Sequence, residues 1–222
     1  MPVPPEQTTK QQREARRAEK VALLKKKQAR DKRNLILGLV GGGAVVLAVI
    51  GLVIAVIAVN AVPKVDPQLI EVEGLQTFDN LPANHVDTAV DYAAEYDMTP
   101  PAGGNHAPVW LNCGIYTEAV PNENAVHDLE HGAVWVTYDP AVITGDALTS
   151  LQDKMKSTYM VLSPFEGLPS PVVASAWGNQ VQLDGADDPE LTQFVNKFWK
   201  ASTAPEPGAP CTGGIDGPGK IS

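Results

Sequence analysis

Residues 35–59 form a run of 25 positions without a charged side chain, and this run constrains the fold more than any other feature. As an α-helix rising 1.5 Å per residue, it would be about 37 Å long, which exceeds the roughly 30 Å hydrocarbon core of a bilayer. A span of this length would be tilted. The sequence therefore predicts a transmembrane helix over residues 35–62.

Charged residues are distributed very unevenly on the two sides of this run. Of the 17 Lys and Arg residues, 11 lie between residues 10 and 33, where a basic arm (residues 1–34) contains four acids. The positive-inside rule places this arm in the cytoplasm and the rest of the chain outside the plasma membrane, as a single-pass protein. A signal peptide cleaved near residues 59–61 is the alternative, but its apolar region is usually about 7–15 residues long, so an uncleaved anchor is favoured.

The C-terminal body is acidic, with 22 acids and six bases after Pro63. Such a body repels nucleic acid and attracts cations, so no nucleic-acid partner is expected. Within the apolar run, Gly38 and Gly42 have the GxxxG spacing that lets helices approach closely. The expected partners are therefore the membrane itself and either a homodimer or a larger membrane complex reached through this helix.

Beyond a linker (63–82), the pattern predicts an extracytoplasmic α/β (α+β) domain over residues 83–202 and a Pro/Gly-rich tail over 203–222. The expected elements alternate between β-rich apolar runs and helical periodicity. A hairpin formed by two predicted strands, at 171–177 and 180–183, is expected to turn at Gly178-Asn179. This β-α-β-β-α order is similar to the second half of a thioredoxin-like fold, although the redox dithiol of that fold is absent. The predicted elements are a strand at 133–138, a helix at 146–156, strands at 158–162, 171–177 and 180–183, and a helix at 188–200.

All four histidines of the chain lie between residues 85 and 131. His127 and His131 are four residues apart, which on a helix places both imidazoles on one face within about 6 Å at their Cβ atoms. One cation could bridge them. The helix that carries them is expected to end at Gly132, in the C′ position, because a β-rich run follows at once.

Three interpretations of the histidines remain open. In the first, the histidines bind copper or zinc, and a thioether ligand would shift the preference toward Cu(I). In the second, the imidazoles are structural. They form hydrogen bonds that hold the helix end and the Pro- and Gly-rich loop at residues 99–108. The predicted metal ligands are His106, His127 and His131, with His85 and Met98 as further candidates.

The third interpretation is a zinc hydrolase, because residues 127–131 match the H-x-x-E-H peptidase pattern with Glu130 as general base. That motif belongs within a longer helix and needs a further carboxylate ligand, so the match is judged coincidental and no catalytic residue is expected. Asp128 and Glu130 are each rotated by about 100° from the shared imidazole face. Both carboxylates are therefore expected at the surface or next to the metal-binding side chains, and not as metal ligands themselves.

Two cysteines, Cys113 and Cys211, both lie on the predicted outer side, where disulfides persist. A bond between them would close a loop of about 100 residues, which the chain-entropy model values at up to about 4.7 kcal/mol. It would also fasten a tail that is poor in apolar residues. A disulfide is therefore predicted, with Cys113 as a thiolate metal ligand as the alternative.

The chain carries a series of spaced motifs, which are His85, Tyr92, Pro100-Pro101-x-x-Gly-x-His106-x-Pro108, Gly114-Ile-Tyr116, His127-x-Leu-Glu130-His131-Gly132 and Tyr138. Together they resemble those of the bacterial domain-of-unknown-function family 3105 over roughly residues 78–200. Members of that family are small envelope proteins with one membrane anchor, and no activity is established for it. The resemblance thus implies a location and a fold more than a function.

The expected function is copper or zinc handling in the cell envelope. The alternative is a non-catalytic accessory subunit of a membrane complex such as a respiratory oxidase assembly.

Overall fold

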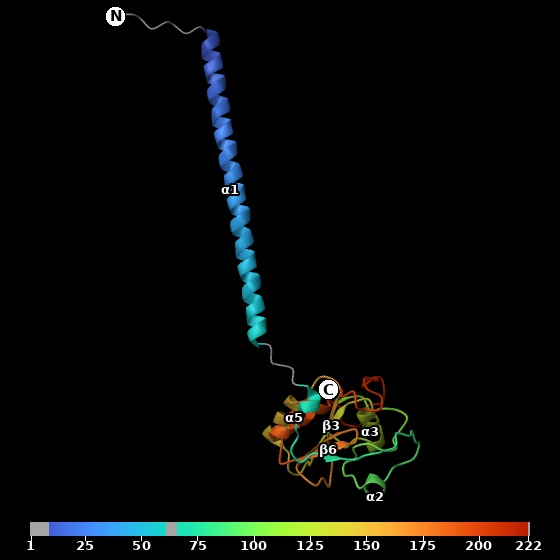
Figure 1. The fold of residues 1–222 in the computed structure, drawn as a ribbon. Coiled ribbons are helices and arrows are strands. Elements are labelled where there is room, and N and C mark those ends of the chain that lie inside the picture. Colours follow the sequence, from blue (N-terminus) through green and yellow to red (C-terminus); the bar gives the residue numbers. More distant parts are fainter. Residues whose placement is uncertain (1–8, 61–65, 222) are drawn as a thin grey trace, which may run out of the picture. The chain divides into compact units, whose positions relative to one another are not determined.

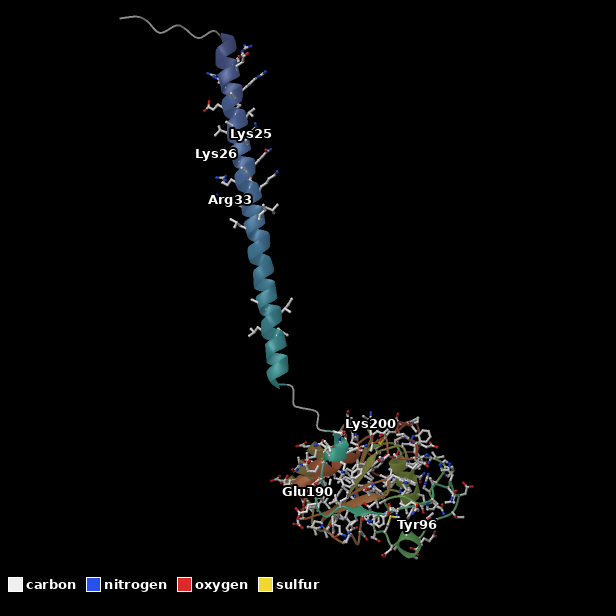
Figure 2. The ribbon with its side chains drawn as sticks, in the orientation of Figure 1. Lys25, Lys26, Arg33, Tyr96, Glu190 and Lys200 are labelled. Carbon is white, nitrogen blue, oxygen red and sulfur yellow. A yellow bond between two sulfur atoms is a disulfide. The ribbon has the colours of Figure 1, made fainter. Side chains whose placement is uncertain are left out.

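The computed structural model describes residues 9–60 and 66–221, which fall into two compact units, Met1–Lys64 and Val65–Ser222. In the first unit, a single helix α1 (Thr9–Asn60) of 52 residues contains residues 9–34 of the basic arm and the whole uncharged run (Figure 1). Residues 1–8 of the arm lie outside the described residues. At 1.5 Å per residue this helix is about 78 Å long. Basic side chains such as Lys25, Lys26 and Arg33 project from its first half into solvent (Figure 2).

No helix within the described ranges is both long enough and apolar enough to cross a membrane. The transmembrane assignment of residues 35–62 is therefore not supported by the structure. Residues 61 and 62, and the first part of the predicted linker at 63–65, lie outside the described residues.

The second unit is built on one mixed six-stranded sheet with the strand order β1-β6-β5-β3-β4-β2 (Figure 1). The central strands β3 and β4 are parallel, and β5 and β6 continue the sheet in antiparallel fashion. The strands are β1 (Gln76–Thr77), β2 (Gly114–Ile115), β3 (Val134–Tyr138), β4 (Met160–Pro164), β5 (Val172–Ala176) and β6 (Asn179–Leu183). The helices are η1 (Pro67–Leu69), α2 (Tyr92–Tyr96), α3 (Asn122–Glu130), α4 (Gly145–Asp153) and α5 (Pro189–Phe198).

Strand β3 is buried on both faces and divides the interior into two apolar clusters. Val134 and Val136 point into the larger cluster, which contains Leu151 of α4 and Phe194 of α5. Trp135, one residue out of phase, points into the smaller cluster with residues of α3. This follows from the period of two along a strand. Helix α3 therefore packs on the face of the sheet opposite to α4 and α5.

The predicted order of elements after residue 133 is confirmed, from β3 through α4, β4, β5 and β6 to α5. The β5–β6 hairpin turns at Trp177-Gly178, where Gly178 has a φ of +68°. Asp188 caps α5 through its side chain, which accepts a hydrogen bond from the N–H of Glu190 at 2.9 Å, and Pro189 follows in the first turn. The mixed α/β class is thus correct, and the likeness to thioredoxin stays a prediction.

The globular unit is larger than the predicted domain at 83–202. In the predicted linker, β1 pairs with β6. In the predicted tail, the N–H of Ile215 donates to the carbonyl of Trp110 at 3.0 Å, and that of Ile221 to the carbonyl of Ile115 at 2.9 Å. The tail therefore docks by backbone hydrogen bonds, which its low apolar content did not reveal.

Candidate metal centre

Helix α3 carries two polar side chains, His127 and Glu130, that are almost fully buried at 3% exposure each. Their i,i+3 spacing places them on neighbouring positions of one helical face. The helix ends directly afterwards, with His131 as the C-cap and Gly132 at a φ of +92°, as predicted. The carboxylate of Glu130 was expected to point away from the imidazoles, and this expectation is wrong.

His106 reaches the same place from the Pro/Gly loop at residues 99–108. Gly103 and Gly104 have φ values of +144° and +107°, and a Cβ at Gly104 would lie 2.8 Å from the ring of Tyr96. Only glycine fits such a position without strain. Tyr96, in α2 at the edge of the unit (Figure 2), accepts the N–H of Asn105 through its hydroxyl at 3.3 Å. The compact loop thereby fixes the backbone on which the fully buried His106 stands.

His85 is held beside His106 by a short parallel bridge. The N–H of Val86 donates to the carbonyl of His106 at 2.7 Å, and the N–H of His106 donates to the carbonyl of Asn84 at 3.1 Å. The side chain of His85 is 45% exposed, unlike those of His106 and His127. His85 therefore forms the solvent-facing side of the cluster.

Three Nε2 atoms converge on one carboxylate oxygen. The Oε2 atom of Glu130 lies 3.0 Å from Nε2 of His106, 3.5 Å from that of His85 and 3.8 Å from that of His127. Two ligands that each lie about 2.0–2.1 Å from a tetrahedral metal are separated by roughly 3.3 Å. The three distances from the carboxylate oxygen bracket this value, which is compatible with a four-coordinate metal between these groups.

The imidazole rings are also spaced as ligands of one ion. Their centroids are 5.0 Å apart for His85 and His106, 4.8 Å for His85 and His127, and 5.0 Å for His106 and His127. Three imidazoles bound through Nε2 to one tetrahedral metal have centroids roughly 5 Å apart, given metal–nitrogen bonds of about 2.1 Å. The structure thus groups His85, His106, His127 and Glu130, with ligand atoms within 4.8 Å of one another.

Backbone carbonyls determine which nitrogen of each buried ring carries a proton. Nδ1 of His106 lies 2.8 Å from the carbonyl oxygen of Gly104, and Nδ1 of His127 lies 2.7 Å from that of Ala107. A carbonyl can only accept, so each Nδ1 must donate its N–H. In the neutral ring Nε2 then has a free lone pair that points toward Glu130, which is the usual arrangement of a metal-binding histidine.

A neutral His106 would direct its Nε2 lone pair at a carboxylate oxygen 3.0 Å away, so a positive charge is required between them. Either a proton on Nε2 or a bound cation supplies it. Burial alone would raise the pKa of Glu130, but the hydrogen bond and charge of His106, with contributions from His127 and His85, lower it. Burial lowers the pKa of His127 to about 4, against the opposing effect of its hydrogen bond to Ala107. At pH 7 the site therefore holds the carboxylate of Glu130 and the neutral imidazole of His127.

The lowered pKa of His127 predicts that the metal-free protein loses stability in mild acid. The unfolded chain protonates this residue near its ordinary pKa of 6.5, whereas the folded chain resists protonation down to about pH 4. Between these values the unfolded state binds more protons, so its relative free energy falls. We expect the free energy of unfolding of chelator-treated protein, measured in urea, to drop by about 2 kcal/mol from pH 7 to pH 5 through this residue. In His127→Gln the drop should shrink by that amount, and an equal drop in both proteins would contradict the assignment.

His131, predicted as a ligand together with His127, does not join this group. Its ring lies against that of His127, with centroids 4.5 Å apart, but its Nδ1 donates to the carbonyl of Pro210 at 2.6 Å. Its Nε2 lies 3.9 Å from a carboxylate oxygen of Glu206. His131 instead forms a second group with Glu130 and Glu206, whose potential ligand atoms lie within 4.8 Å of one another. Its hydrogen bond to Pro210 suits the structural role of the second interpretation. Its role as a ligand stays a prediction.

Met98 is buried. Its role as a ligand stays a prediction. Trp110 and Trp177 are partly buried and stand against the imidazoles, with centroids 5.8 Å from His127 and 5.7 Å from His106 respectively. These apolar rings exclude water from the protein side of the cluster, which strengthens electrostatic interactions there.

The match to a family model agrees with the motif resemblance. A model described as a protein of unknown function (DUF3105) covers residues 85–213, so the chain belongs to this family. No curated protein and no solved structure matches the chain. The matched range contains all four residues of the metal cluster and both cysteines.

Proposed function

We propose that residues 66–221 form a metal-binding domain in which His85, His106, His127 and Glu130 hold one transition-metal ion. The observation that carries the proposal is the convergence of three Nε2 atoms on one carboxylate oxygen, at 3.0, 3.5 and 3.8 Å. Carbonyl anchors on two of the rings support it, because they orient the lone pairs before any metal arrives. The buried carboxylate lowers the charge of a divalent complex to +1.

The donor set favours Zn²⁺ or Cu²⁺. Imidazole nitrogens suit both ions, and a carboxylate oxygen is a harder ligand than the thioether or thiolate that selects Cu(I). The four ligands fill a tetrahedral Zn²⁺ shell, whereas Cu²⁺ would adopt a more tetragonal arrangement and recruit water on the exposed side.

The exposure of His85 bears on what such a centre would do. Three ligands are buried and fixed, while the fourth is 45% exposed and can swing away without disturbing the core. Release of one labile ligand opens a coordination position to solvent, which suits the exchange of the ion with another carrier. We therefore propose metal handling, that is buffering or delivery.

Metal titration of the purified full chain, produced without a histidine tag, tests this function. We expect about one Zn²⁺ or Cu²⁺ per chain, and a thermal unfolding temperature that rises with metal concentration because the ion binds the folded state. At 100 times the dissociation constant the gain in stability is about 2.7 kcal/mol. Protein that stays metal-free after incubation with either ion at pH 7.5, with no change in unfolding temperature, would refute the proposal.

We also propose that the domain lies outside the cytoplasmic membrane, tethered by the uncharged residues 35–59. The support is the sequence itself, with its basic arm before the run and an acidic body after it. A protease added to intact spheroplasts should digest a C-terminal epitope tag and spare an N-terminal one, and carbonate should leave the chain in the membrane pellet. Protection of the C-terminal tag, or extraction by carbonate, would overturn this location.

A further inference from the structure

A second group of potential metal ligands surrounds the disulfide. Cys113 and Cys211 are bonded, with their Cα atoms 5.4 Å apart, as the sequence predicted. The carboxyl group of Asp128 has an oxygen within 4.8 Å of both sulfurs. Asp128 was expected either at the surface or behind the ligands of α3, and its full burial excludes the surface position.

The carboxyl group of Asp128 has no hydrogen-bond partner. Both of its oxygens are buried and unpartnered in the described part of the chain. An unsatisfied buried polar group costs about 1–3 kcal/mol, and more when it is charged. Burial raises the pKa of Asp128 well above its usual range, which is consistent with this isolation. The disulfide bond has no hydrogen-bond donor. In the oxidised protein, the carboxyl group of Asp128 therefore receives no stabilising hydrogen bond within the described part of the chain.

The two cysteines would remain adjacent if the bond between them were reduced. The N–H of Cys113 donates to the carbonyl of Cys211 at 2.8 Å, and the N–H of Asn112 donates to that of Ile215 at 2.7 Å. Further along the tail, the N–H of Thr117 donates to the carbonyl of Gly219 at 2.9 Å. These contacts hold the tail on both sides of the cysteine pair independently of the sulfur–sulfur bond.

We propose that reduction of the disulfide creates a second metal site, in which the thiolates of Cys113 and Cys211 and the carboxylate of Asp128 bind one thiophilic divalent cation of the Zn²⁺ class. The reductant is a dithiol, which gives two electrons and two protons and becomes a disulfide itself, while Cys113 and Cys211 become thiols. The cation then displaces one proton from each ligand group that carries one. Thiolate ligands favour ions such as Zn²⁺. Water or another exchangeable ligand fills the fourth coordination position of the ion.

This site is independent of the His/Glu centre, because it uses other side chains and exists only in the reduced protein. Cd²⁺ is a suitable probe, since a thiolate–Cd²⁺ bond gives an ultraviolet charge-transfer band that histidine and carboxylate ligands do not give. The full chain, treated with a phosphine reductant, should develop this band and saturate it at about one Cd²⁺ per chain. Oxidised protein should not develop it.

Two variants make the test specific. Asp128→Asn keeps the shape of the side chain but removes the anionic ligand, and should weaken Cd²⁺ binding at the thiolates by more than about 10-fold. Asp146→Asn, on the exposed first turn of α4, is the matched control and should bind as the parent does. Absence of the band in reduced protein, equal affinity in Asp128→Asn and the parent, or loss of cooperative unfolding on reduction before metal is added would each overturn the proposal.

Discussion

Replacing His127 with alanine is expected to weaken Zn²⁺ or Cu²⁺ binding by more than about 100-fold, because changes to groups behind metal ligands already cost 10–100-fold. His127 is buried, its Nδ1 is held by Ala107, and its Nε2 points at Oε2 of Glu130. The measurement is competition against a chromophoric chelator at pH 7.5, with circular dichroism to verify the fold.

His131→Ala is the matched control for this prediction, since the two imidazoles are neighbours on the same helix end. This variant should lower metal affinity by less than about 10-fold, yet lower stability by about 0.5–1.5 kcal/mol, because the part-buried hydrogen bond to the carbonyl of Pro210 is lost. The two variants should therefore show opposite patterns. Loss of metal binding in both variants would restore the helical pair predicted from sequence. Loss in His131→Ala with retention in His127→Ala would refute the arrangement around Glu130.

Removal of the disulfide should have the second-largest effect. The double variant Cys113→Ser with Cys211→Ser removes a covalent link across a sequence separation of 98 residues. A loop of this length is worth up to about 4.7 kcal/mol in the chain-entropy model, and typical measured values are about 2–4 kcal/mol. We expect the free energy of unfolding in urea to fall by about 2–4 kcal/mol, with a steeper dependence on urea because the unlinked chain unfolds further.

The double variant should still fold and bind metal at the His/Glu centre, since the tail keeps its backbone hydrogen bonds to residues 110–117. Reduction of the parent protein should reproduce the same loss of stability. A change smaller than about 0.5 kcal/mol in both cases would show that the disulfide forms a loop already closed in the unfolded state, contrary to the entropic account.

Local sequence signals were sufficient for the elements after residue 133. The β-branched and aromatic residues of β3 were enough to predict this strand, and Gly132 was enough to predict the end of α3. Both features depend on residues that are neighbours in the chain. The linker strand β1 was missed, since Gln76 and Thr77 carry no apolar alternation and pair only through their backbone with β6. Such an edge strand is determined by the sheet it joins.

Three residues of the candidate metal cluster, His85, His106 and His127, were predicted from the sequence, whereas Glu130 was not. The spacing of His127 and His131 suggested a helical pair, although His127 and Glu130 satisfy the same neighbour rule at i,i+3. His131 is hydrogen-bonded to the carbonyl of Pro210, which is 79 residues away in sequence, and His106 reaches Glu130 from 24 residues away. No local pattern contains that information. The four residues come together only when the loop that carries His106 packs against α3.

Anomalous diffraction from crystals of the full chain grown with Zn²⁺ tests the central claim most directly. The account predicts one strong peak at the zinc edge about 2.1 Å from the Nε2 atoms of His85, His106 and His127, and at a similar distance from a carboxylate oxygen of Glu130. A peak between His131 and Glu206, or no peak among the three imidazoles at saturating Zn²⁺, would contradict it.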